Sequence, residues 1–129
     1  MTPTTDEPDL NTVHLRGRVT SLDEPRSLPS GDVVHGLRVT VTRALRPGAS
    51  RAAADTVDVA CWSPATRRVA GRLVVGERVE VDGAIRRRFF RAGAAPVSRY
   101  EVEASRVRRL PPARPRPVRS GEARGAGSP

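Results

Sequence analysis

Apolar residues alternate with polar ones in five segments of this chain, and a period of two is typical of β-strands with one face in a core. The predicted strands are residues 12–20, 33–43, 56–62, 78–90 and 99–107. Gly17 and Gly83 interrupt the first and fourth strands, where a glycine often marks a bulge or a sharp bend. Between the fourth and fifth strands, RAGAAPVS at residues 91–98 is expected to form a loop.

The period changes after residue 62, where a short helix is predicted. Ser63 can cap this helix and Pro64 suits its first position. An apolar stripe at helical spacing is formed by Ala65, Val69, Ala70 and Leu73. Gly76 is placed to end the helix, and Gly71 lowers its stability, so the helix should be short.

The order β-β-β-α-β-β is the plan of the OB-fold, a five-stranded Greek-key barrel that commonly binds oligonucleotides. We therefore predict an all-β OB-fold domain over residues 11–110, with its helix between strands three and four. Residues 1–10 are expected to form a disordered acidic leader. Residues 111–129 are expected to form a disordered basic tail, because they are rich in Pro, Arg and Gly and lack the apolar residues needed to fold.

The fourth predicted strand carries two contrasting faces. The face expected to enter the core holds Val79, Val81, Gly83 and Ile85. The other face ends in Arg86, Arg88 and Phe90, which combine two guanidinium groups with an aromatic ring. This combination suits a nucleic-acid strand, because phosphates attract cations and bases stack on flat apolar groups.

Charge favours the same kind of partner. The net charge is +9, and all 23 basic residues are Arg. Residues 11–110 carry 19 Arg against ten acidic residues, so the predicted domain is basic in its own right and favours a polyanion. The lack of Lys is equally well explained by GC-rich coding DNA, so it carries little weight.

The sequence contains no recognisable catalytic or metal-binding motif. Cys61 is the single cysteine, which excludes an intramolecular disulfide and a cysteine-based zinc site, and we expect it to pack as a small hydrophobe. Asp58 and Glu80 are interpreted as surface charges or ion-pair partners. We therefore expect no enzyme activity, no cofactor and no metal. The sequence shows no signal peptide and no run of transmembrane length, so a cytoplasmic, nucleoid-associated protein is expected.

Several motifs, in this order, resemble the bacterial single-stranded DNA-binding protein family. They are residues 11–19 (NTVHLRGRV), 28–31 (LPSG), Trp62 with the helix after it, 76–88 (GERVEVDGAIRRR) and 100–102 (YEV). The resemblance covers about residues 11 to 109. It implies an OB-fold, usually in a homotetramer, that protects single-stranded DNA in replication, recombination and repair without catalysis, cofactor or membrane.

The candidate DNA-binding residues are Trp62, Phe90, Arg86, Arg88, Arg16, Arg18 and Arg38. Phe90 occupies the position where the family usually has a base-stacking Trp, and Trp62 matches another stacking position. The alternatives are that Phe90 packs against the following loop and that Trp62 covers the helix start, with its indole N–H on a carbonyl.

The arginines of this set have outward strand phase. Arg86 and Arg88 are expected to contact phosphates, whereas the other three either extend this basic track or are solvated surface residues. Two neighbours have inward phase instead: Arg87, which suits a subunit contact, and Phe89, which suits a core or rim position.

The chain also departs from the family pattern. Only 3% of residues are aromatic, and two usual stacking positions hold residues 44–46 (ALR) and Thr56. Affinity should then depend more on Arg and fall steeply with salt. The short basic tail differs from the family's acidic, Phe-containing tip, so recruitment of repair proteins through such a tip is not expected. The alternative function is an OB-fold interaction or scaffold module that has lost strand binding.

Overall fold

The computed structural model describes residues 6–45, 47–48, 50 and 53–112, so the first half of the predicted leader and most of the predicted tail lie outside it. The elements are β1 (Val13–Leu22), β2 (Arg26–Ser27), β3 (Val33–Thr42), β4 (Ala54–Cys61), α1 (Pro64–Ala70), β5 (Arg78–Ala92) and β6 (Ala95–Arg109). Strands with a helix between β4 and β5 confirm the predicted OB-fold class. The short strand β2 was not predicted, because its segment is rich in turn residues.

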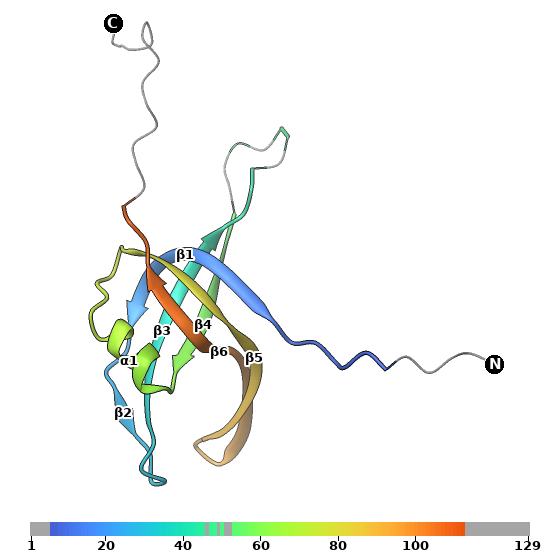
Figure 1. Ribbon diagram of the computed structural model, residues 1–129. Helices are drawn as coiled ribbons and strands as arrows, with labels where there is room; N and C mark the ends of the chain where they lie inside the picture. Colours follow the sequence, from blue (N-terminus) through green and yellow to red (C-terminus); the bar gives the residue numbers. More distant parts are fainter. Residues whose placement is uncertain (1–5, 46, 49, 51–52, 113–129) are drawn as a thin grey trace, which may run out of the picture.

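The strands close into a barrel because β1 pairs on both of its sides. The sheet order is β1-β5-β6-β4-β3-β2, and β1 also pairs with β3 (Figure 1). Gly17 lies where β1 crosses from β5 to β3, and a Cβ there would stand 2.4 Å from the carbonyl oxygen of Thr40. Gly17 therefore permits a close approach of two strands, while the bulge of β1 falls later, between Val19 and Ser21.

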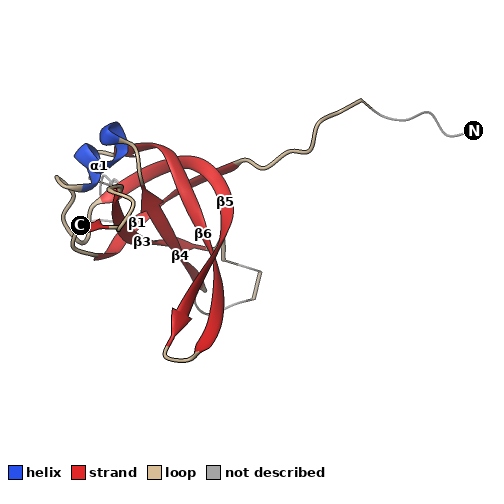
Figure 2. Cartoon of the chain, turned by 90° about the horizontal axis from the view of Figure 1, so that it is seen from below, coloured by secondary structure: helices blue, strands red, loops and turns tan. Residues whose placement is uncertain are grey.

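A long β5–β6 hairpin replaces the predicted loop at residues 91–98. The strands pair out to Ala92 and Ala95, so Gly93 and Ala94 alone connect them, and Gly93 has the positive φ (66°) that a two-residue hairpin turn requires. Their register shifts between Asp82 and Gly83, which confirms the expected irregularity at Gly83. The outer half of the hairpin projects beyond the barrel (Figure 2).

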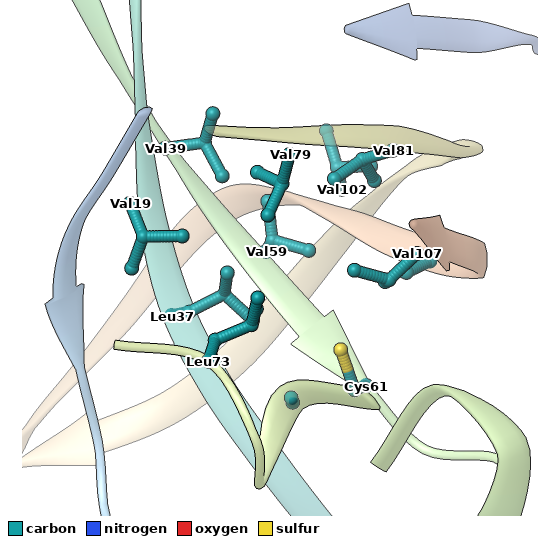
Figure 3. Close-up of a cluster of buried hydrophobic side chains, with 12 residues drawn as sticks. Val19, Leu37, Val39, Val59, Cys61, Leu73, Val79, Val81, Val102 and Val107 are labelled. Carbon is teal, nitrogen blue, oxygen red and sulfur yellow. The ribbon is translucent and has the colours of Figure 1, made fainter. Parts of the chain in front are cut away.

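The core is filled by the alternating residues that the strand pattern indicated (Figure 3). Its buried members include Val19, Leu37, Val39, Val59, Cys61, Val79, Val81, Val102 and Val107. Burial raises the pKa of the Cys61 thiol to about 11, so the thiol is neutral at pH 7 and packs as a small hydrophobe, as predicted. Ile85 was wrongly placed in this core: it is 48% exposed, because β5 has left the barrel at that point.

The helix α1 ends before Gly76, the residue that was expected to terminate it. Ser63 caps it, with its Oγ accepting a hydrogen bond from the backbone N–H of Thr66 at 3.1 Å. The buried residues of α1 are Thr66 and Ala70, whereas Ala65, which was predicted to join the apolar stripe, is exposed. Gly71 rather than Gly76 caps the helix C-terminus, so the helix ends one turn early.

Candidate nucleic-acid interface

A groove of about 720 Å³ lies between the β2–β3 region and the β5–β6 hairpin, with β4 between them. Four of the predicted site residues line it together: Arg38, Trp62, Arg88 and Phe90. They come from β3, the β4–α1 junction and β5, so the fold gathers residues that are far apart in sequence. Strand phase explains this for Arg38, Arg88 and Phe90, which project from outward positions of their strands, and Trp62 directly follows the last residue of β4.

The other three predicted residues do not line the groove. Arg86 lies on β5 and donates from Nε to Glu103 Oε1 at 2.8 Å. Arg16 lies on β1, where its Nε donates to Glu80 Oε2 at 3.0 Å, and Arg18 lies two residues further along the same strand. The role expected for these three arginines stays a prediction.

Trp62 lies between the last residue of β4 and Ser63, the N-cap of α1. The Arg88 guanidinium carbon stands 4.9 Å from the centroid of the Trp62 ring, in cation–π contact. Among the described residues, the buried indole Nε1 has no hydrogen-bond partner, so the carbonyl contact considered for it from the sequence is not formed. The ring is therefore held by packing and by Arg88.

Arg88 belongs to a cluster of ion pairs on the groove side of the hairpin. Its Nε donates to Glu101 Oε2 at 2.8 Å, and its Nη2 approaches Glu103 Oε2 at 3.3 Å. Glu103 in turn holds Arg86. Carboxylates of β6 thus hold both arginines and would compete with a phosphate for their N–H groups.

A second group of contacts in the groove joins β3 and β4 to the hairpin through Asp58 and extends to Phe90. Arg38 Nε donates to Asp58 Oδ1 at 2.9 Å, and Arg99 Nη1 lies 3.7 Å from Asp58 Oδ2. The Arg99 guanidinium also stands 5.2 Å from the ring centroid of Phe90. Phe90 is 40% exposed, so part of its ring remains accessible to a base.

Sequence reasoning missed several groove residues. The lining contains five arginines and four carboxylates: Arg26, Arg38, Arg88, Arg91, Arg99, Asp23, Glu24, Asp58 and Glu101. Arg91 was missed because residues 91–98 were expected to form a loop. Arg99 lies at the start of the fifth predicted strand, but only the hairpin register places it opposite Arg88. The groove is therefore only slightly positive, and the basic excess of the domain is distributed over other surfaces as well.

Thr56, which stands where the family often has an aromatic residue, belongs to a row of threonines on the sheet. Thr20, Thr40 and Thr56 form a row across β1, β3 and β4, joined by hydroxyl contacts of 3.0 Å. A threonine row offers hydrogen bonds but no ring, so base stacking in this part of the sheet has no aromatic partner.

No cluster of three or more His, Cys, Asp or Glu side chains suited to a metal ion occurs in the part of the chain that the structure describes. Glu80 is the most perturbed carboxylate, with its pKa lowered to about 2 by hydrogen bonds from Arg108, His14 and Arg16. It is an ion-pair partner, as predicted, and so is Asp58. Over the same described ranges, no helix is long and apolar enough to cross a membrane.

The family model that matches this chain is that of the single-strand binding protein family, and the match spans residues 10–110. The chain belongs to this family. The resemblance found in the motifs is thereby confirmed, and the groove occupies the domain that the family match covers.

Solved structures support the same fold. One is a Plasmodium falciparum SSB in complex with ssDNA, with a TM-score of 0.69 and 19% identity, covering 83% of this chain and 100% of that chain. Another is a deletion mutant of the single-stranded DNA binding protein from Thermus aquaticus, with a TM-score of 0.67 and 22% identity, covering 80% of this chain and 51% of that chain. No curated protein matches the chain.

Proposed function

We propose that this protein binds single-stranded DNA without sequence preference in the groove between β3, β4 and the β5–β6 hairpin. The observation that carries the proposal is the convergence of two aromatic rings, Trp62 and Phe90, with Arg38, Arg88 and Arg99 in one groove. Rings accept any base by stacking, and guanidinium groups bind phosphate oxygens in the fork geometry of an ion pair. Membership of the single-strand binding protein family supports the same function.

Binding in this groove involves competition for the arginines. Arg88 and Arg38 each hold a carboxylate in the unbound protein, and a phosphate that enters competes with these carboxylates for the guanidinium N–H groups. When Arg88 turns towards a phosphate, the face of Trp62 that it covers becomes available to a base. Stacking on Trp62 and phosphate binding by Arg88 are then coupled in one step.

The biological role that follows is protection of exposed single strands in replication, recombination or repair. The groove offers binding chemistry, so we propose that the protein acts without catalysis, cofactor or metal. As in its family, we propose a homo-oligomer, with a tetramer as the expected state, and association with the nucleoid through the bound DNA.

The proposal is tested by titrating the protein with an oligo-dT strand while following the emission of Trp62, the single tryptophan of the chain. We expect quenching that saturates, that weakens as salt rises, and that a duplex of equal length does not reproduce at the same concentration. Lack of quenching and of any mobility shift at low salt would contradict strand binding. A protein partner that remains bound after nuclease treatment would then favour the scaffold function.

A further inference from the structure

We propose that Arg18 and Arg78, the arginine pair, form a phosphate-binding site on the outer wall of the barrel, an inference that stands whether or not the groove binds DNA. The two residues are direct partners where β1 and β5 run antiparallel. Their chain neighbours Val19 and Val79 are fully buried, so both arginines point away from the core. Neither arginine lines the groove.

The arginine pair has no counter-ion of its own. Two like charges directly opposite each other on neighbouring strands destabilise a sheet, because they repel. Across the part of the chain that the structure describes, neither the Arg18 nor the Arg78 side chain has a hydrogen bond or an ion pair. An anion that binds both guanidinium groups would remove this repulsion.

The carboxylates beside the arginine pair are already held by other groups. Glu80 lies two residues along β5 from Arg78 and is hydrogen-bonded to three basic side chains of β1 and β6. Glu77, which precedes Arg78, accepts a hydrogen bond from the backbone N–H of Val74 at 2.8 Å and lies 3.5 Å from Arg109. The anion that neutralises the arginine pair must therefore come from outside these contacts.

A phosphate group suits the arginine pair better than a carboxylate does. Each guanidinium group offers two parallel N–H donors, and one such fork matches the two oxygens of one carboxylate. A phosphate group is tetrahedral and carries more oxygens, so it can accept from two forks that approach from opposite strands.

A row of hydroxyl groups adds a further donor. It starts at Thr40, the partner of Arg18 on β3, and joins Thr20 and Thr56 through contacts of 3.0 Å. Three hydroxyl groups carry three hydrogens, and their two mutual contacts use two of them. One hydrogen is therefore left for an outside acceptor next to the arginine pair.

The phosphate has two possible sources, a free phosphate ion or ester and the backbone of a single strand. Thr40 and Thr56 pair with each other two residues along from Arg38 and Asp58, which line the groove. The threonine row thus separates the arginine pair from the groove. Free phosphate can bind there without entering the groove, and a strand that crosses the row would bring its own phosphates to the site.

The first test is thermal unfolding in sodium phosphate and in sodium chloride at equal ionic strength and pH 7. Phosphate near its dissociation constant should raise the Tm of the wild-type protein by about 3 °C over chloride. Arg18→Gln and Arg78→Gln should lose this shift, while their Tm in chloride stays at least as high as that of wild type, because the repulsion is gone.

Arg72→Gln is the matched control for these two variants. Arg72 is exposed, follows α1 and has no ion pair within the described ranges, so its replacement should leave the phosphate shift intact. The general exclusion of phosphate from protein surfaces acts on all variants alike. A difference between Arg78→Gln and Arg72→Gln therefore reports the site itself.

A second measurement identifies the source of the phosphate. Binding of an oligo-dT strand of about 20 nucleotides is followed by Trp62 quenching at several salt concentrations. If the strand occupies the site, Arg78→Gln should reduce the salt slope by about 0.7, the value for one phosphate contact on a single strand. An unchanged slope together with the lost Tm shift assigns the site to free phosphate or a small ester.

Equal phosphate shifts in wild type, Arg18→Gln and Arg78→Gln, together with an unchanged salt slope, would overturn the inference. A lower oligomer mass in these variants with equal phosphate shifts would also overturn it, in favour of a subunit contact. If the wild-type protein showed the phosphate shift but no quenching by oligo-dT, the proposed function would fail and the phosphate site would stand.

Discussion

Removing one carboxylate from the groove is expected to strengthen DNA binding. Glu101 accepts a hydrogen bond from Arg88 Nε at 2.8 Å, and its side chain is only 18% exposed. A phosphate that takes over Arg88 would lie about 5 Å from this carboxylate, where like charges repel by about 1 kcal/mol in a largely aqueous setting. Glu101→Gln should therefore tighten binding of oligo-dT by about fivefold at low salt, because 1.4 kcal/mol corresponds to about tenfold.

The assay is a fluorescence titration of each variant with one oligo-dT length, at several salt concentrations. Asp55→Asn is the matched control, because it removes the same charge from an ion pair with Arg43 that lies outside the groove lining. Equal affinity gains in the two variants, or weaker binding by Glu101→Gln, would refute the competition between carboxylate and phosphate.

Three further predictions concern stability. Gly83→Ala should destabilise the protein by about 2 kcal/mol in chemical denaturation, because the new Cβ would stand 2.1 Å from the carbonyl oxygen of Glu103. Gly71→Ala is the control and should not lose stability, because the nearest atom to its new Cβ would be 3.4 Å away. Ser63→Ala should cost about 1 kcal/mol through loss of the helix cap, and Ser63→Asp should retain most of the stability; equal losses would argue against capping. The pKa of Glu80 is lowered from 4.5 to about 2, so its stabilising contribution is present above about pH 4.5 and lost as the pH falls towards 2. The difference in Tm between wild type and Glu80→Gln should therefore shrink over this range, and a difference independent of pH would contradict the assignment.

The alternation of apolar residues predicted the barrel well. Val79 and Val81 were placed in the core by phase, and both are fully buried. Phase fixes which side of a strand a residue faces but not where the core ends, so Ile85 and Phe89, which is 73% exposed, were misplaced. The turn at Gly93 was not predicted, because Pro96 usually marks a loop or a strand edge. In the structure Pro96 lies in the projecting end of the hairpin, where β6 pairs on one side only and a proline is tolerated.

The candidate site was predicted in part. Trp62, Phe90, Arg88 and Arg38 meet in one groove because their outward phase is a property of the sequence. Their ion pairs were not predictable, since the partners of Arg88 depend on the hairpin register. That register includes the shift at Gly83, which leaves Ser105 opposite no residue of β5. Glu101 and Glu103 are therefore recognised as partners of Arg88 only once the strands are paired.

Binding of a single strand in the groove is tested most directly by the affinity of the Trp62→Ala, Phe90→Ala double variant for oligo-dT at physiological salt. Each base stacked on an aromatic ring contributes about 1–3 kcal/mol, so removing both rings should weaken binding at least about thirtyfold. Val74→Ala truncates a residue that is 62% exposed and lies outside the groove lining, and it serves as the control. We expect fluorescence anisotropy of a labelled strand to show near-complete loss of binding in the folded double variant and wild-type affinity in the control. Wild-type affinity in the double variant would contradict binding in this groove.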